Sequence, residues 1–194
     1  MDTRVLLISH AATPAMRQGR FPADDPLDAR GMADAEASRE RLPSIDAAVT
    51  LSSPAACARE TAQALGLTAR VAPELSEMNY GQWRGRRLAE LAEEAPRELA
   101  AWSRDPGAAP HGGESFVQTL ARVGGWLDSL GETASMIAIT HASVIRAALI
   151  HALDAPPASF ARIEVAPLSV VEIRRSARGW AWWFQCSSSP KDSD

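Results

Sequence analysis

Short apolar runs along the chain predict strands that are buried on both faces of a sheet. Three such runs, each rich in aliphatic or β-branched side chains, lie at Val5–Ile8, Ala47–Leu51 and Met136–Thr140. A short strand is also expected at Ala69–Val71. Near the C-terminus, Leu168–Arg174 and Trp180–Phe184 predict two strands that are joined by a turn.

Helical patterns separate these runs. The clearest is an apolar stripe at spacings of three and four, which predicts a helix from Phe116 to Leu130. Other helices are expected over 28–42, from Ser53–Pro54 to Gly66, over 87–104 with a break near Pro96, and over 143–153. Alternating strands and helices indicate an α/β fold, a three-layer sandwich with a mostly parallel central sheet flanked by helices. We expect residues 1–186 to form one domain and residues 187–194 to be a disordered tail.

Composition and charge exclude several classes of protein. Hydrophobic residues make up 46% and charged residues 23%, close to a globular average and unlike a disordered chain or a fibrous rod. The net charge is −4, from 20 Lys and Arg against 24 Asp and Glu, so no overall positive field attracts nucleic acid or an acidic membrane. Two cysteines provide no disulfide framework, and no apolar run is long enough for a signal peptide or a membrane span. A cytoplasmic protein is therefore expected, and its oligomeric state stays open.

Two of the predicted strands end in the same way. Ser9–His10 and Thr140–His141 each place a histidine directly after a buried apolar run. In open α/β sheets, ligands bind beyond the carboxyl ends of the strands. The two histidines are therefore the first candidates for a functional site.

The segments around these histidines resemble the motifs of the histidine phosphatase superfamily, the phosphoglycerate mutase-like proteins. Ser9–Thr13 is similar to that family's Arg-His-Gly signature, which is followed by an acidic residue and Thr. Five more blocks follow in the family's order, at Asp25–Gly31, Ser52–Ala62, Glu77–Gly85, Gly112–Ser115 and Thr140–Arg146. The block that begins at Glu77 resembles the small phosphatases of the family, including the α-ribazole phosphatase-like members.

The resemblance implies a phosphomonoesterase that acts on a small phosphate ester without a cofactor. His10 matches the nucleophile that becomes a phosphohistidine, and Glu77 matches the acid and base of the reaction. His141 matches the second phosphate-binding histidine. A phosphoryl group in transfer needs cations around its oxygens, which the family supplies with arginines.

Both central arginines of the family pattern are replaced here. Ser9 and Cys57 stand at these phosphate-binding positions. Because a single arginine can contribute roughly 10³ or more to phosphoryl transfer, we expect atypical or reduced activity. Arg17, and with less weight Arg20, are the candidates to replace the lost cations. Without the arginines, and with Glu77 nearby, His10 is also expected to gain a proton more easily.

Two other functions stay open on the sequence alone. One is a catalytically inactive member of the same fold that binds a ligand or a partner. The other, given less weight, is a metal-binding pocket formed by His10, His141, Cys57 and Glu77, since these are ligand types that zinc accepts.

Overall fold

Six strands form a single mixed sheet in the order β3-β2-β4-β1-β5-β6 in the computed structural model, which describes residues 3–42, 49–131 and 135–184. The strands are β1 (Thr3–Ser9), β2 (Val49–Ser52), β3 (Arg70–Val71), β4 (Ser135–Thr140), β5 (Val170–Ser176) and β6 (Gly179–Trp183). The first four run parallel to one another, whereas β5 is antiparallel to β1 and to β6. The mostly parallel sheet is thereby confirmed. Ala47 and Ala48, expected at the start of β2, lie outside the described residues.

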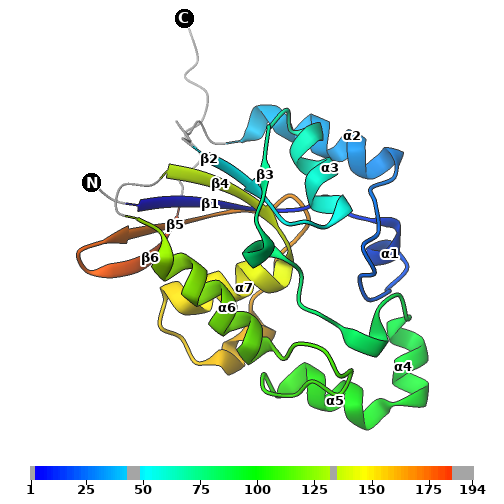
Figure 1. The fold of residues 1–194 in the computed structure, drawn as a ribbon. Coiled ribbons are helices and arrows are strands. Elements are labelled where there is room, and N and C mark those ends of the chain that lie inside the picture. Colours follow the sequence, from blue (N-terminus) through cyan, green and yellow to red (C-terminus); the bar gives the residue numbers. More distant parts are fainter. Residues whose placement is uncertain (1–2, 43–48, 132–134, 185–194) are drawn as a thin grey trace, which may run out of the picture.

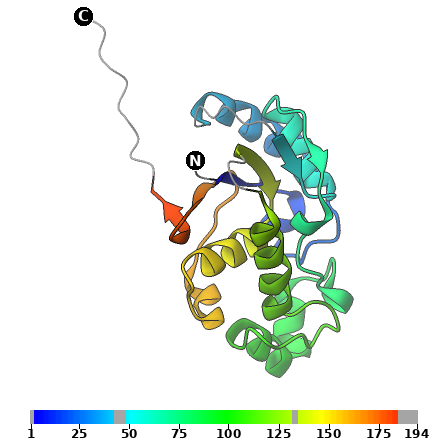
Figure 2. The same ribbon diagram turned by 60° about the vertical axis from the view of Figure 1, so that its left-hand side comes forward.

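Helices cover both faces of the sheet, as the fully buried side chains of β1 require. Val5 and Leu7 pack with α6 (Phe116–Ser129) and α7 (Ala142–Ala152) on one face. Leu6 and Ile8 pack on the other face against α3 (Ala56–Ala64), beside which lies α2 (Ala29–Ser38). Figure 1 shows the resulting three layers, and Figure 2 shows the same layers from another side. The α/β sandwich predicted from the alternation of elements is confirmed.

Side-chain caps fix where several helices begin. Asp28 accepts a hydrogen bond from Gly31 N at 2.9 Å and starts α2 as expected. The helix α3 begins at Ala56 rather than at Ser53–Pro54. Ser53 Oγ instead accepts a hydrogen bond from Ala55 N at 3.2 Å and contacts His141. The prediction of that start was wrong because Ser53 serves a long-range contact that the local pattern does not contain.

Three short helices gather beyond the carboxyl ends of the parallel strands (Figure 1). They are α1 (Pro14–Arg17), which the sequence pattern did not predict, α4 (Leu88–Glu94) and α5 (Pro96–Arg104). An apolar cluster of Phe21, Trp83 and Leu91, with Tyr80 and Trp102 against it, holds this region together. Short 3-10 helices lie at Arg39–Arg41, Pro73–Leu75, Gly81–Trp83 and Pro157–Arg162. No helix in the described ranges is long and apolar enough to cross a bilayer.

Candidate active site

The two candidate histidines meet at the carboxyl end of the sheet. His10 follows β1 and His141 follows β4, and these neighbouring strands pair Ser9 with Thr140 in parallel register. The backbone N–H of His10 donates to Thr140 O at 2.9 Å. The two buried rings lie edge to face with their centroids 5.0 Å apart. The sequence pattern therefore correctly identified two strand ends that converge.

Hydrogen bonds at the two rings show which ring nitrogens are already bound and which remain free to react. His10 Nδ1 lies 2.8 Å from Ala11 O, and because a carbonyl oxygen only accepts, Nδ1 carries the proton and Nε2 keeps its lone pair. His141 Nε2 lies 2.8 Å from Ser53 Oγ. His141 Nδ1 is buried and has no hydrogen-bond partner in the described part of the chain, although Glu77 Oε2 lies 3.5 Å away.

Glu77 is held beside His141 by contacts from two directions. Its Oε1 accepts hydrogen bonds from the Ser143 hydroxyl at the start of α7 and from Met78 N at 2.8 Å. Arg122 on α6 donates to the carbonyl oxygens of Glu74 at 2.7 Å and Ser76 at 3.1 Å, which fixes the segment leading to Glu77. Burial raises the pKa of the Glu77 carboxyl group above its usual value. A carboxyl group in this state can hold a proton and then release it, as a general acid must.

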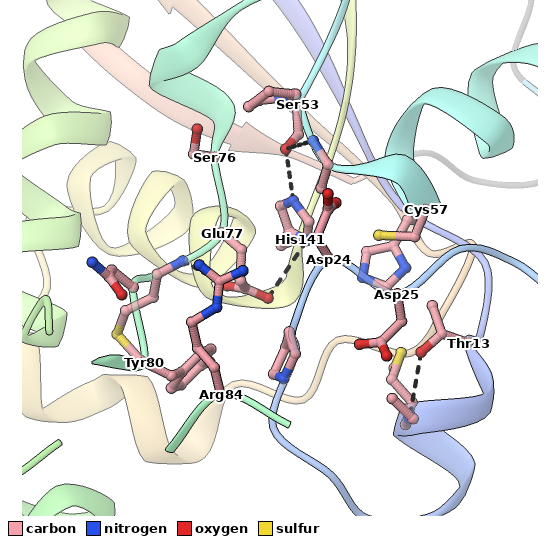
Figure 3. A pocket seen from close by; sticks show the side chains of 18 of the residues that line it. Thr13, Asp24, Asp25, Ser53, Cys57, Ser76, Glu77, Tyr80, Arg84 and His141 are labelled. Carbon is pink, nitrogen blue, oxygen red and sulfur yellow. Dashed lines mark hydrogen bonds and ion pairs between the residues drawn. The ribbon is translucent and has the colours of Figure 1, made fainter. Parts of the chain in front are cut away.

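A pocket of about 380 Å³ opens over these groups (Figure 3). Five of the seven residues predicted for the site line it: His10, Arg20, Cys57, Glu77 and His141. Ser9 is buried in β1 and is not among the lining residues. Arg17 is also outside the lining, because its guanidinium group pairs with Asp28 and donates to Ala12 O at 3.1 Å. To reach a ligand, Arg17 would first have to leave this pair.

Arg84 is a lining residue that the sequence reasoning missed. It is exposed, and its side chain forms no hydrogen bond or ion pair with the residues that the structure describes. Arg20, by contrast, already donates to Gln18 Oε1 and to Gly85 O, both at 3.0 Å. The signal was present in the sequence, because the block Glu77–Gly85 resembles the family pattern Glu-x-x-Phe-Gly-x-Trp-Glu-Gly, and Arg84 stands at the position of its second glutamate. A comparison of the positions where the family's arginines are lost does not reveal an arginine gained elsewhere.

Acidic side chains also line the pocket. Asp24 and Asp25 face it together with Glu77, against two arginines, so the formal charge of its lining is −1 when all five groups are ionised. Asp24 Oδ1 accepts from Ala56 N at 2.8 Å, at the first turn of α3. The N-terminus of a helix attracts anions, and here a carboxylate of the protein itself occupies that place.

Burial governs the protonation of the ring groups. Desolvation, with the neighbouring His141, lowers the pKa of His10 to about 4, and this outweighs the upward effect of Glu77. Desolvation, with Arg122, lowers the pKa of His141 to about 3. Glu77 does raise the pKa of His10, as expected, but burial lowers this pKa by more. The sequence does not show how deeply His10 is buried, so the lower pKa could not be predicted from it. At neutral pH both imidazoles are neutral, as a nitrogen nucleophile must be.

Cys57 completes a compact group of soft and borderline ligands. Its Sγ and one ring nitrogen each of His10 and His141 all lie within 4.8 Å of one another, and all three residues are buried. Glu77 is not part of this group, so the four-residue arrangement considered from the sequence is reduced to three ligands with a carboxylate beside them. Burial, together with the charge of Glu77, raises the pKa of the Cys57 thiol to about 12.

Curated relatives of the chain include phosphatases. A 184-residue match at 33% identity to the bifunctional protein Rv2228c of Mycobacterium tuberculosis covers 88% of this chain. The chain spans only about half of that relative, 50% of its length. The adenosylcobalamin/α-ribazole phosphatase of Salmonella typhimurium is 28% identical over 88% of this chain and 90% of its own length.

Solved structures share the fold over nearly the whole chain. Mycobacterial glucosyl-3-phosphoglycerate phosphatase in complex with VO3 matches with a TM-score of 0.82 and 27% identity, over 93% of this chain and 96% of that one. The protein TTHB049 from Thermus thermophilus is 34% identical with a TM-score of 0.72, over 88% and 93% of the two chains. The model of the histidine phosphatase superfamily (branch 1) matches residues 5–185. By its sequence, its sheet and the paired histidines at the end of β1 and β4, the chain belongs to the histidine phosphatase superfamily.

Proposed function

We propose that the protein is a slow phosphomonoesterase that transfers a phosphoryl group to His10. One observation carries the proposal. The Nδ1–H of His10 is bound to Ala11 O, which leaves the lone pair of Nε2 on a neutral ring in the pocket that Glu77 and His141 also line. A positioned nucleophile and a carboxyl group with a raised pKa are the two groups that a double-displacement hydrolysis requires.

The reaction proceeds in two balanced steps. In the first, His10 Nε2 forms a bond to phosphorus, the bond from phosphorus to the ester oxygen breaks, and Glu77 gives its proton to the leaving oxygen. In the second, the Glu77 carboxylate takes a proton from water, the resulting hydroxide attacks phosphorus, and the P–N bond breaks. Inorganic phosphate leaves, and His10 and Glu77 return to their initial states. His141, oriented by Ser53, lies beside the transferred group.

The charges of the pocket account for a reduced rate. Arg84 has a guanidinium group free to bind the phosphoryl oxygens, and Arg20 adds a second positive charge. Asp24 and Asp25 oppose them from the same lining. Because catalysis of phosphoryl transfer depends mainly on cations around the developing charge, this balance favours a rate well below that of relatives with two further arginines.

The substrate is proposed to be a small phosphate monoester, in keeping with a pocket of about 380 Å³. Relatives named for α-ribazole phosphate and for glucosyl-3-phosphoglycerate support this class. These two esters and a generic aryl phosphate form the panel to be tested.

Steady-state hydrolysis of the panel tests the proposal. We expect turnover by the wild-type protein that falls at least about 10³-fold in His10→Ala, because the nucleophile is lost. Arg84→Gln is expected to lower kcat/KM about 10- to 100-fold, whereas its matched control Arg86→Gln, whose side chain pairs with Glu94 at 2.5 Å, changes it less than about twofold. Turnover that survives in His10→Ala would contradict the proposal. No turnover of any ester by a folded wild-type protein would support the catalytically inactive alternative instead.

A gain of function provides a second test. Cys57 is buried and lines the pocket, so an arginine at this position would extend toward the phosphoryl group. We expect Cys57→Arg to raise kcat/KM by about 10²-fold or more, which is the scale of a well-placed arginine. A folded Cys57→Arg protein with lower activity than wild type would show that the loss of this arginine does not limit the rate.

A further inference from the structure

We propose that His10, Cys57 and His141 form a binding site for a borderline divalent metal ion of the zinc class, and that the metal-bound form cannot transfer phosphoryl groups. The three side chains come from three separate segments, the ends of β1 and β4 and the first turn of α3. Figure 3 shows Cys57 and His141 on the same side of the pocket. A thiolate and two imidazoles are the donor set that zinc prefers.

The spacing of the donor atoms is close to that of a coordinated ion. Sγ of Cys57 and the ring nitrogens of His10 and His141 lie within 4.8 Å of one another. Donor pairs on a tetrahedral zinc ion are roughly 3.3–3.6 Å apart, as its bond lengths of about 2.0–2.3 Å imply. Closure around an ion therefore requires shifts of about one ångström or less for each side chain, within the reach of side-chain rotations.

The second nitrogen of each ring is already bound to an oxygen. Ala11 O accepts from Nδ1 of His10 at 2.8 Å, and Ser53 Oγ lies 2.8 Å from Nε2 of His141. Metal-ligating histidines almost always have such a partner on the other nitrogen, which fixes the ring orientation. In this arrangement His10 offers Nε2 and His141 offers Nδ1 to an ion.

An unpartnered buried atom points to a ligand independently of the spacing. His141 is 2% exposed, and its Nδ1 has no hydrogen-bond partner within the described ranges. A buried polar atom without a partner is costly, and a bound ion would satisfy it. Glu77 Oε2, 3.5 Å from this nitrogen, and the acidic Asp24 and Asp25 add negative charge around the position of the ion.

Metal binding and phosphoryl transfer exclude each other. An ion at this site occupies Nε2 of His10, the atom proposed to attack phosphorus. Coordination by Cys57 also releases its thiol proton to solvent, because the thiolate is the ligand. Three protein ligands leave the fourth position of a tetrahedral ion open to the pocket, where water completes the shell.

Cobalt(II) spectroscopy tests the site without relying on turnover. The probe is Co²⁺ added to the metal-free full chain carrying Cys186→Ser, which removes the second thiol. We expect one equivalent to bind, with a near-ultraviolet thiolate charge-transfer band and the intense visible bands of tetrahedral cobalt. One equivalent of Zn²⁺ should abolish both. Absence of the charge-transfer band in the folded protein would overturn the proposal.

Variants in the same background assign the ligands. Cys57→Ser should remove the charge-transfer band and weaken zinc binding at least about 100-fold, more than the loss of an outer partner costs. His141→Ala should weaken zinc binding comparably, whereas the matched control His151→Gln, on the helix α7 that follows His141 but bound to Asp128 at 3.0 Å, should leave it unchanged. Urea unfolding of each variant confirms the fold, and Cys57→Ala replaces Cys57→Ser if that protein does not fold. A zinc affinity that is equal in Cys57→Ser and in wild type would contradict the assignment.

The metal site rests on the proposed function only for its effect on activity, and different results would contradict each of the two proposals. A protein that hydrolyses the esters but shows no cobalt spectrum retains the proposed function and loses the metal site. A protein that binds cobalt through Cys57 but hydrolyses no ester retains the metal site and loses the proposed function. If both hold, Zn²⁺ inhibits hydrolysis by the metal-free protein with a midpoint that matches its directly measured dissociation constant.

Discussion

The loop that carries Glu77 packs so closely against a neighbouring loop that a single added methyl group should destabilise the protein. A Cβ on Gly113 would overlap Asn79 O and lie 2.7 Å from the Asn79 carbonyl carbon and from Gly81 N. All three contacts are with backbone atoms, which cannot rotate away. The substitution Gly113→Ala must therefore push the segment 79–81 outward, two residues beyond Glu77.

The loss in the free energy of unfolding can be calculated from the hydrogen bonds that this displacement breaks. Two backbone hydrogen bonds join the loops at this point, from Glu114 N to Asn79 O at 2.7 Å and from Gln82 N to His111 O at 2.9 Å. At about 1 kcal/mol each, with 1–3 kcal/mol for the overpacking, the free energy of unfolding should fall by about 3–5 kcal/mol. A displacement of about 1 Å at Glu77 would lower kcat/KM by about 10²-fold.

Urea unfolding and aryl phosphate hydrolysis measure both effects. The control is Gly125→Ala in α6, where a Cβ meets nothing within 4 Å. It should raise the free energy of unfolding by about 0.5–1 kcal/mol, because alanine favours the helix, and leave kcat/KM unchanged. A Gly113→Ala protein within about 0.5 kcal/mol of wild type would refute the close approach of the two loops.

Two further predictions concern the charges of the pocket. Asp24→Asn keeps an acceptor for Ala56 N, and asparagine also tolerates the positive φ of 69° at this position. This substitution should raise kcat/KM about tenfold, because it removes a negative charge from a helix N-terminus that would otherwise attract the phosphate, and such a charge is worth up to about 2 kcal/mol. An unchanged kcat/KM would contradict this. In metal-free buffer the free energy of unfolding should fall as the pH drops from about 6.5 toward 4, since the unfolded chain binds protons there while His10 and His141, with pKa values of about 4 and 3, do not. Each of these two histidines contributes a slope of up to about 1.4 kcal/mol per pH unit, and urea titrations should find the slope smaller in His141→Asn than in wild type; an equal slope in that variant would rule out this origin.

Local patterns were sufficient to predict the sheet and the two histidines. A short continuous apolar run such as Val5–Ile8 is typical of a strand covered on both faces, and the structure buries all four of its side chains completely. Parallel strands then bring their carboxyl ends to one edge, which places His10 beside His141 without knowledge of any contact.

The electrostatic details of the pocket depend on contacts between distant segments. Asp24 reaches the first turn of α3, thirty-two positions away, and Ser53 reaches His141 across eighty-eight. Neither contact produces a local pattern in the sequence from which it could be predicted. Arg17, the first candidate for a replacement cation, was chosen by its closeness to His10 in the chain. Its pair with Asp28 could not be predicted, because it depends on how the loop between them folds.

The central claim is that His10 receives the phosphoryl group, and rapid-quench labelling tests it most directly. The metal-free protein is mixed with a ³²P-labelled phosphate ester, quenched in base within one turnover, and digested for peptide mapping. The account predicts an acid-labile, base-stable phosphohistidine on the peptide that contains His10, formed and lost at the rate of turnover. Release of inorganic phosphate without this label, or with the label on another residue, would contradict it.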